Sequence, residues 1–484
     1  MTRDPIRLLS VALFAAALAS CTSRTPEQQL VHEAAEALGG VDRVQGASGT
    51  LVVEGSGRQF NLGQDLRPGL AGQTFAVSAY TRAYDLAAPR LRVSQTRTPD
   101  FAYFQGPQAQ TQVQGVDGEV AYNATGDAPA TRAPEALARE RRAERFHHPL
   151  VLLKAALDPA AALGNFRTSG PERLLDIDTP AGTITLAVGA DGRPTRIESA
   201  GAHANLGDVT LATTFADYAA SDGLQMPGRI ATRVDAFTTG EYTLTSRLDA
   251  GLDLAAPASA ATAAAPGPPA VDVRVEAIAP GVWFLAGQSH HSVAVAFRDR
   301  LVLIEAPQSE ARTAAVIAKA RELSPATPLT HLVLSHHHFD HSAGLRAAIA
   351  EGLTVVTHEG NADFVREMAA RPFTRRPDAL ATAARAATVE PVGDTHTISD
   401  GTRSLVLHHV AGNPHSDTML MAYLPRERVL VEVDAFSPGG TYHPYAANLL
   451  EHIRRLRLRV DRIVPLHGAP VALRDLEAAV AAQP

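Results

Sequence analysis

The sequence predicts a mixed α/β protein with two folded domains, a mainly antiparallel β domain followed by a layered α/β domain. The chain has 484 residues, about three times the length of a typical domain. Residues 253–270 contain four prolines among many alanines, and such a segment without a core-forming pattern is typical of a linker. Before this linker, apolar and polar residues alternate as in strands. After it, strand-like and helix-like periods follow one another, which favours an α/β layer structure.

Composition excludes several classes of protein. Hydrophobic residues make up 45% of the chain and charged residues 20%, values that fit a folded globular protein and not a disordered one. The net charge is −7, so there is no electrostatic basis for nucleic-acid binding. A single cysteine excludes an intrachain disulfide framework and a cysteine-rich zinc module. Histidine is unevenly distributed, because 15 of 19 lie after residue 272.

The N-terminus predicts an export signal. Arg3 and Arg7 precede the apolar run Leu8–Ala19, which is long enough for a signal-peptide core but too short to span a bilayer. The run ends in Leu18-Ala19-Ser20-Cys21, which resembles a bacterial lipobox. The resemblance implies a signal peptide over residues 1–20, lipidation at Cys21, a lipidated tether over residues 21–27, and a lipid anchor at a membrane surface of the cell envelope. Thr22 replaces the aspartate that usually retains lipoproteins at the inner membrane, so the resemblance favours the outer membrane, facing the periplasm. An ordinary secretory signal with an accidental cysteine is the alternative.

The first domain is expected over residues 28–252. A helical pattern, Gln28–Leu38, ends at two glycines, a common helix C-terminal signal. Turn clusters then separate β-type segments, and one helical segment interrupts them. We expect strands at Thr50–Glu54, Gly182–Val188 and Thr195–Ser199, and the helix-prone interruption at Pro134–Leu157. The pattern resembles the half-open barrel of LolA/LolB-type lipoprotein carriers, which implies a domain that binds an amphiphile or positions the enzyme. The pair His147-His148 is expected to lie on the surface.

The second domain, residues 273–484, alternates strands and helices. The helices are expected at Ser309–Leu323, Ser342–Ala350, Asn448–Leu458 and Ala472–Ala482. The strands are expected at Val293–Phe297, Leu301–Ile304, Leu329–Leu334, Leu353–Thr357, Ser404–Val410, Thr418–Leu424, Val429–Val433 and Arg462–Leu466. Strands mixed with crossover helices predict a sheet buried between helices.

Seven possible metal ligands follow these strands. The run Ser335–His341 comes directly after the strand 329–334, so His336 and His338 lie in a loop while Asp340 and His341 begin the next helix. The other three candidates each lie just past a strand: His415, Asp434 and His467. Side chains gathered at strand ends are what a sheet-based active site requires.

Over residues 273–484, this pattern resembles the metallo-β-lactamase fold superfamily, an αββα sandwich. The resemblance rests on the motif His336-x-His338-x-Asp340-His341 and on the order of the three later ligands. It implies a first metal ion held by His336, His338 and His415, a second held by Asp340, His341 and His467, and Asp434 bridging both. The ligands are nitrogen and oxygen, which suits two divalent ions, zinc above all, without excluding iron or manganese.

The resemblance implies an exported metal-dependent hydrolase that acts on a small molecule. Two ions can share a water and lower its pKa, giving a metal-bound hydroxide that cleaves an ester, lactone, thioester or amide. Asp340 is the expected catalytic residue, steering the nucleophile and carrying a proton. His290, His291, Tyr442 and His443 are candidates for substrate binding, whereas His337 is expected to point away from the metals.

Two departures from the family pattern leave alternatives open. Asp434 stands where the antibiotic-degrading branches usually carry Cys or Ser. With a carboxylate at this position, the chain instead resembles the glyoxalase II, lactonase and alkylsulfatase-like branches. Ile304–Pro307 stands where many members have an Asp-Thr-Gly turn. The alternatives are a β-lactamase, an iron-dependent oxidoreductase of the same fold, and a non-catalytic envelope binding protein.

Overall fold

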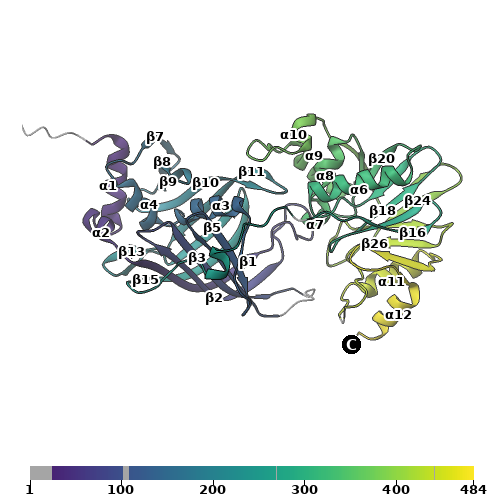
Figure 1. The fold of residues 1–484 in the computed structure, drawn as a ribbon, viewed down its shortest axis with the longest axis horizontal. Coiled ribbons are helices and arrows are strands. Elements are labelled where there is room, and N and C mark those ends of the chain that lie inside the picture. The colour runs from purple at the N-terminus through teal and green to yellow at the C-terminus, as the bar shows by residue number, and fades with distance from the viewer. Residues whose placement is uncertain (1–23, 102–107, 269, 441, 484) are drawn as a thin grey trace, which may run out of the picture.

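The computed structural model describes residues 24–101, 108–268, 270–440 and 442–483, which form two domains (Figure 1). The predicted signal peptide and Cys21 lie outside the described residues. Among the residues that are described, no helix is both long and apolar enough to cross a membrane.

The N-terminal domain is built on one 13-stranded antiparallel sheet. Along the sheet the strands are β6 (Thr131–Arg132), β5 (Val120–Thr125), β4 (Gln110–Asp117), β3 (Arg90–Pro99), β2 (Thr74–Asp85), β1 (Thr50–Phe60), β15 (Phe237–Asp249), β14 (Arg229–Val234), β11 (Gly207–Ala216), β10 (Pro194–His203), β9 (Gly182–Val188), β8 (Glu172–Thr179) and β7 (Leu163–Ser169). A separate pair joins β12 (Ala219–Ser221) to β13 (Leu224–Met226). The register pairs Phe60 with Thr74, so residues 61–73 form the loop between β1 and β2.

Four helices pack against this sheet. They are α1 (Pro26–Ala37), α2 (Val41–Gly46), α3 (Glu135–Arg145) and α4 (Pro149–Ala156). Thr25 and Gln28 form a reciprocal capping box at the start of α1, which satisfies two backbone donors that the first turn leaves free. Leu30 from α1, the C-cap residue Leu38 and Leu150 from α4 lie in the same core as the sheet residues.

The helix-prone segment 134–157 is helical, as predicted, and forms two separate helices, α3 and α4. Pro149 occupies the first turn of α4 and His148 is its N-cap; a proline has no N–H to continue the preceding helix but suits a first turn. The surface position expected for His147 and His148 is wrong, since both are buried. His147 hydrogen-bonds the hydroxyls of Thr213 and Ser199 at 3.0 and 2.9 Å, so burial leaves both ring nitrogens satisfied.

The Ala/Pro segment 253–272 joins the two domains. It contains a short helix, α5 (Ala258–Ala261), and Leu254 and Ala260 are buried. The Ser259 hydroxyl donates to the Ala130 carbonyl at 2.8 Å. Part of this segment therefore packs on the β5–β6 edge of the N-terminal domain before the chain enters the second domain.

The C-terminal domain contains two sheets. The seven-stranded sheet has the order β16 (Arg274–Ala279), β17 (Val282–Ala286), β18 (Ser292–Ala296), β19 (Leu301–Ile304), β20 (Leu329–Val333), β21 (Thr354–His358), β22 (Thr388–Val392). The six-stranded sheet has the order β23 (Thr395–Ser399), β24 (Ser404–His409), β25 (Leu420–Leu424), β26 (Val429–Glu432), β27 (Arg462–Pro465), β28 (Val471–Ala472). The helices are α6 (Glu310–Leu323), α7 (Phe339–Ser342), α8 (Leu345–Ala350), α9 (Ala362–Ala370), α10 (Ala379–Ala383), α11 (Ala446–Arg455) and α12 (Leu473–Ala481), with the 3-10 turn η1 (Glu359–Asn361).

Three hydrophobic layers show that this domain is an αββα sandwich, as predicted. Residues of both sheets, such as Val302 and Val431, share the central core. Helices α6, α8 and α9 pack on the outer face of the first sheet, and α11 and α12 pack on the outer face of the second. Strands β19, β20 and β21 are parallel, as are β26 and β27, so the loops after their carboxyl ends gather at one edge of the sandwich.

Candidate metal centre

The histidine motif leaves β20 and enters α7 through a buried loop. The Glu305 carboxylate, just past β19, accepts a hydrogen bond from the Ser335 backbone N–H at 2.7 Å and one from His341 Nδ1 at 2.8 Å. Glu305 is fully buried and has a φ of 73°, an uncommon conformation for a residue with a side chain. This carboxylate ties the two ends of the motif together and leaves His341 Nε2 free to face the site. In the sequence, Ile304–Pro307 departs from the common Asp-Thr-Gly turn, and its place directly after a strand is the signal that could have identified Glu305.

A first group of four buried ligands consists of His336, His338, His415 and Asp434, whose ligand atoms all lie within 4.8 Å of one another. Oδ2 of Asp434 lies 3.1 Å from His336 Nε2 and 2.9 Å from His415 Nε2. Within the described part of the chain, His338 Nδ1 is buried and has no hydrogen-bond partner. Buried polar atoms are normally hydrogen-bonded or bound to an ion, so this nitrogen is available to bind a metal ion.

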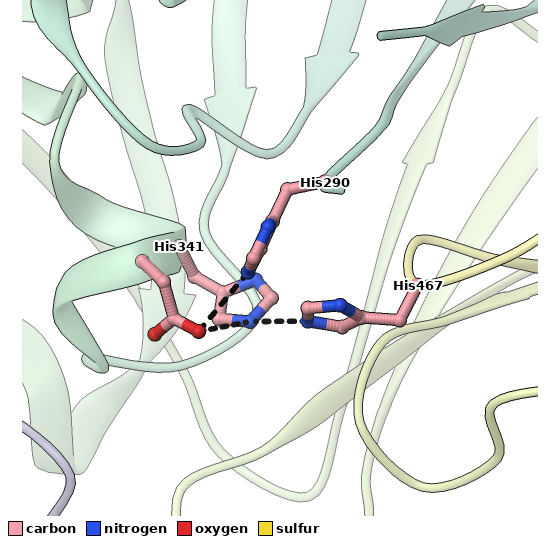
Figure 2. A group of neighbouring side chains, drawn as sticks. His290, His341 and His467 are labelled. Carbon is pink, nitrogen blue, oxygen red and sulfur yellow. Dashed lines mark hydrogen bonds and ion pairs between the residues drawn. The ribbon is translucent and has the colours of Figure 1, made fainter. Parts of the chain in front are cut away.

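A second group consists of His290, Asp340, His341 and His467, again with ligand atoms within 4.8 Å. Figure 2 shows the three imidazoles converging from three separate segments. Oδ2 of Asp340 lies 3.0 Å from His290 Nε2 and 3.7 Å from His341 Nε2. His467 Nε2 lies 3.1 Å from His341 Nε2.

The carboxylate of Asp434 connects the two groups. Its Oδ2 contacts His336 and His415 of the first group and lies 3.0 Å from His341 Nε2 of the second. Its Oδ1 lies 2.7 Å from His467 Nε2. Asp434 follows β26 and is buried, so one side chain reaches the ligands of both groups.

The spacing of the ligand atoms fits metal ions. Two donors on one zinc at Zn–N distances near 2.0–2.1 Å are about 3.3 Å apart in a tetrahedron. The contacting pairs described above are 2.7 to 3.7 Å apart, and all ligand atoms within each group lie within 4.8 Å of one another. Burial lowers the pKa of His336 to about 3, so this imidazole is neutral and able to bind a metal. Burial opposes the charge on Asp434, but His341, His467 and His415 outweigh it and hold the pKa of this carboxyl well below its usual range.

The structure brings together all seven sequence-predicted ligands and separates the four predicted substrate residues. His290 joins the second group, although its place in the sequence predicted substrate binding and no metal contact. His291 instead packs its ring on Phe284 and accepts a hydrogen bond from the Gly287 N–H at 3.2 Å. His443 contacts the Gly440 carbonyl at 2.9 Å and Tyr442 is exposed; neither belongs to the two ligand groups.

His337 lies outside both groups, as expected from its place in the motif. Its Nε2 is 3.4 Å from Asp65 Oδ1 and its ring contacts Phe364. Successive motif residues therefore face opposite directions, with His336 and His338 toward the ligands and His337 toward the N-terminal domain.

Comparisons with known proteins identify the C-terminal region. Residues 286–467 match the model of the metallo-beta-lactamase superfamily. Solved structures with a similar fold include a metallo-beta-lactamase from Pontibacter korlensis (19% identity, TM-score 0.34, 44% of this chain and 98% of that chain). Another is the metallo-beta-lactamase FIM-1 from Pseudomonas aeruginosa in its mono-zinc form (17% identity, TM-score 0.35, 44% and 96%). A third is a metallo-beta-lactamase from Hirschia baltica (17% identity, TM-score 0.34, 44% and 98%). No curated protein sequence matches the chain. The resemblance of residues 28–252 to LolA/LolB carriers is not confirmed.

Proposed function

From the metallo-beta-lactamase superfamily domain at residues 286–467, we propose that the chain is a hydrolase with a dinuclear metal centre. The observation that carries the proposal is the placement of Asp434, whose two carboxylate oxygens reach histidines of both ligand groups. The first ion would be held by His336, His338, His415 and Asp434. The second would be held by His290, Asp340, His341, His467 and the same Asp434. The all-nitrogen and oxygen donor set suits zinc.

When bound, such ions supply Lewis-acid chemistry and lower the pKa of a water toward 7. The chain's own residues supply orientation and proton transfer. Asp340 is the best candidate for the residue that accepts the proton, since its side chain is 37% exposed while the ligands of the first group are buried. Its carboxylate is ionised, because burial is outweighed by His341 and His290, which keep its pKa low. An ionised carboxylate at the open side of the site can orient a water and accept its proton.

We propose an ester, lactone, thioester or amide as the scissile group of a small-molecule substrate. The test is a hydrolysis panel of lactones, thioesters, aryl esters, amides and β-lactams, run on the zinc-loaded full chain after measurement of metal per chain. Two zinc ions per chain and turnover of one class are expected. Iron as the only bound metal would favour the oxidoreductase alternative, and two bound ions without turnover of any class would favour a binding protein. Preference for β-lactams would favour the β-lactamase alternative.

We also propose that the chain is exported and anchored through a lipid on Cys21, which is supported by the lipobox-like Leu18–Cys21. The Cys21→Ser variant should move from the membrane fraction to the soluble periplasmic fraction, and mass spectrometry should show acylation only in the wild type. An unacylated wild type would contradict this proposal without affecting the proposed hydrolase.

A further inference from the structure

Residues 61–73 of the N-terminal domain lie against the metal centre of the other domain. The loop is closed at its base by hydrogen bonds between the Asn61 N–H and the Gln73 carbonyl at 2.7 Å and between the Gln73 N–H and the Gln64 carbonyl at 3.3 Å. These bonds extend the β1–β2 pairing and give the loop a defined shape.

Backbone contacts and one ion pair dock this loop on the histidine motif and on Asp417, two residues after His415. The Phe339 N–H donates to the Gly63 carbonyl at 3.2 Å, and the Asp417 N–H donates to the Leu66 carbonyl at 2.9 Å. Arg67 Nε also donates to the Asp417 carboxylate at 2.6 Å. Gly63 has a φ of +77°, and a Cβ built there would lie 2.3 Å from the Phe339 ring. Only glycine permits so close an approach of the loop to α7.

The Asp65 carbonyl oxygen lies 2.8 Å from His338 Nε2. A carbonyl can only accept, so Nε2 carries the proton and the neutral ring has its lone pair on Nδ1. Nδ1 is the nitrogen that is buried without a hydrogen-bond partner in the described residues. The loop therefore selects the tautomer that leaves the lone pair of Nδ1 facing the first ligand group, where His338 would hold the first ion.

The Gln64 side chain holds a ligand of the second group, Asp340, in one orientation. Its Nε2 donates to Oδ1 of Asp340 at 2.7 Å. The other oxygen, Oδ2, faces His290 and His341 at 3.0 and 3.7 Å. A hydrogen bond to one carboxylate oxygen fixes which oxygen is presented to the metal and in what orientation.

Taken with the proposed function, on which this inference rests, these contacts lead us to propose that the N-terminal domain completes the metal centre. Asp65, through its carbonyl, and Gln64, through its amide, are positioning residues for His338 and Asp340, one in each ligand group. A contact that only holds two domains together can involve any surface atom. These two contacts instead involve Nε2 of His338 and Oδ1 of Asp340, the atoms of two candidate metal ligands that point away from their ligand groups. Partners of this outer kind typically contribute 10–100-fold to metal affinity.

The test uses cobalt(II) as the probe, titrated into the chelator-stripped full chain, with visible absorption and competition against a chromophoric chelator. Gly63→Ala forces the loop away from Phe339, while the control Gly69→Ala imposes a similar backbone strain (φ +85°) with nothing within 4 Å of the new Cβ. Gln64→Leu removes the donor to Asp340, and its control Gln29→Leu makes the same change on α1, where Gln29 donates to Glu33. Thermal unfolding of the metal-free variants checks that each one folds.

Gln64→Leu is expected to bind cobalt about 10–100-fold more weakly at the second site. Gly63→Ala displaces the loop that carries both Gln64 and Asp65, so it is expected to weaken cobalt binding by a similar factor at both sites. Both variants should change the cobalt absorption spectrum, whereas both controls match the wild type. Wild-type affinity and spectrum in both loop variants would overturn the role of the loop and leave the hydrolase proposal standing. A wild type that binds no cobalt would overturn the hydrolase proposal itself, and the loop proposal with it.

Discussion

The carboxylate of Glu305 accepts a hydrogen bond from Nδ1 of His341 at 2.8 Å, and both side chains are buried. Metal-binding histidines commonly use their second nitrogen in this way, which fixes the ring and raises its basicity. Here the same carboxylate also accepts from the Ser335 backbone, so one residue orients His341 and holds the loop that carries His336.

Glu305→Gln should therefore lower metal affinity without unfolding the domain. The amide can accept from only one of the two donors, and its NH₂ group faces the other. Metal binding weaker by about 10–100-fold is expected, with the larger loss at the second site, measured by chelator competition. Glu427→Gln is the control, because Glu427 is a buried carboxylate of the same domain that pairs with Arg403. Equal metal affinities in the two variants would show that Glu305 serves only the fold.

Substitution of Asp434 should mainly reduce the bound metal, whereas substitution of Asp340 should mainly reduce the rate of hydrolysis. Asp434→Ala deletes the carboxylate that contacts both groups, so metal per chain should fall substantially. Asp340→Asn keeps an oxygen in the second group but no longer accepts a proton, so it should retain more metal and lose about 10²–10⁴-fold in rate. Metal content and hydrolysis should be measured on the same preparations. Unimpaired turnover of Asp340→Asn would contradict the role given to this residue.

His337→Ala is the companion control for these variants. His337 stands inside the motif but contacts Asp65 and Phe364, so its loss should lower the melting temperature while metal per folded chain stays near the wild-type value. The same measurement on His338→Ala should show a clear loss of metal. If the two variants lose metal equally, the histidines have been assigned to the wrong roles.

The sandwich and its seven ligands were predictable because each ligand follows a strand. Leu329–Val333 and Val429–Glu432 are short segments rich in leucine and valine, which is typical of strands, and parallel neighbours place the next residues at one edge. The sequence-based strand bounds at Leu329–Leu334 and Val429–Val433 differ from these by one residue, which is the usual uncertainty of such ends. The local sequence pattern was sufficient to predict these ligands because the burial and the direction of each strand fix the position of the residue that follows it.

The remainder depends on contacts that no local pattern encodes. Gln64 reaches Asp340 across 276 positions of sequence, and nothing in the run Asn61–Gln73 marks it as part of a metal site. Glu305 follows a strand just as the ligands do, and this signal was visible in the sequence. Its role could not be predicted, because the sequence does not show in which direction the Glu305 side chain points. The burial of His147 depends on hydroxyl partners from β10 and β11, which a surface interpretation of two adjacent histidines could not include.

Those buried histidines predict a pH dependence for the N-terminal domain. Burial, aided by Arg82, lowers the pKa of His147 and of His148 to about 3 in the folded state, against about 6.5 when unfolded. Between pH 3 and 6.5 the unfolded chain therefore binds more protons, so stability falls as the pH drops through this window and is insensitive to these groups above it. The slope is about 1.4 kcal/mol per pH unit for each histidine.

Hydrogen–deuterium exchange of α4 at pH 7.5, 6.0 and 5.0, corrected for the intrinsic exchange rate, measures this dependence. His147→Gln should reduce the slope by about half, because only His148 then titrates on opening. His32→Gln, on the less buried face of α1, should change it less. Identical slopes in the wild type and His147→Gln would contradict the assignment.

The final prediction separates the two neighbouring histidines before β18. Nε2 of His290 lies 3.0 Å from Asp340 and its ring centroid 4.0 Å from that of His467, whereas His291 packs on Phe284. His290→Ala should remove one donor from the second ion, so metal per folded chain should fall from two toward one and the cobalt spectrum should lose the features of the second site. His291→Ala removes the same side chain one position away and should lower thermal stability while both ions remain. Two ions and an unchanged cobalt spectrum in His290→Ala would return this residue to the substrate-lining role that the sequence first suggested.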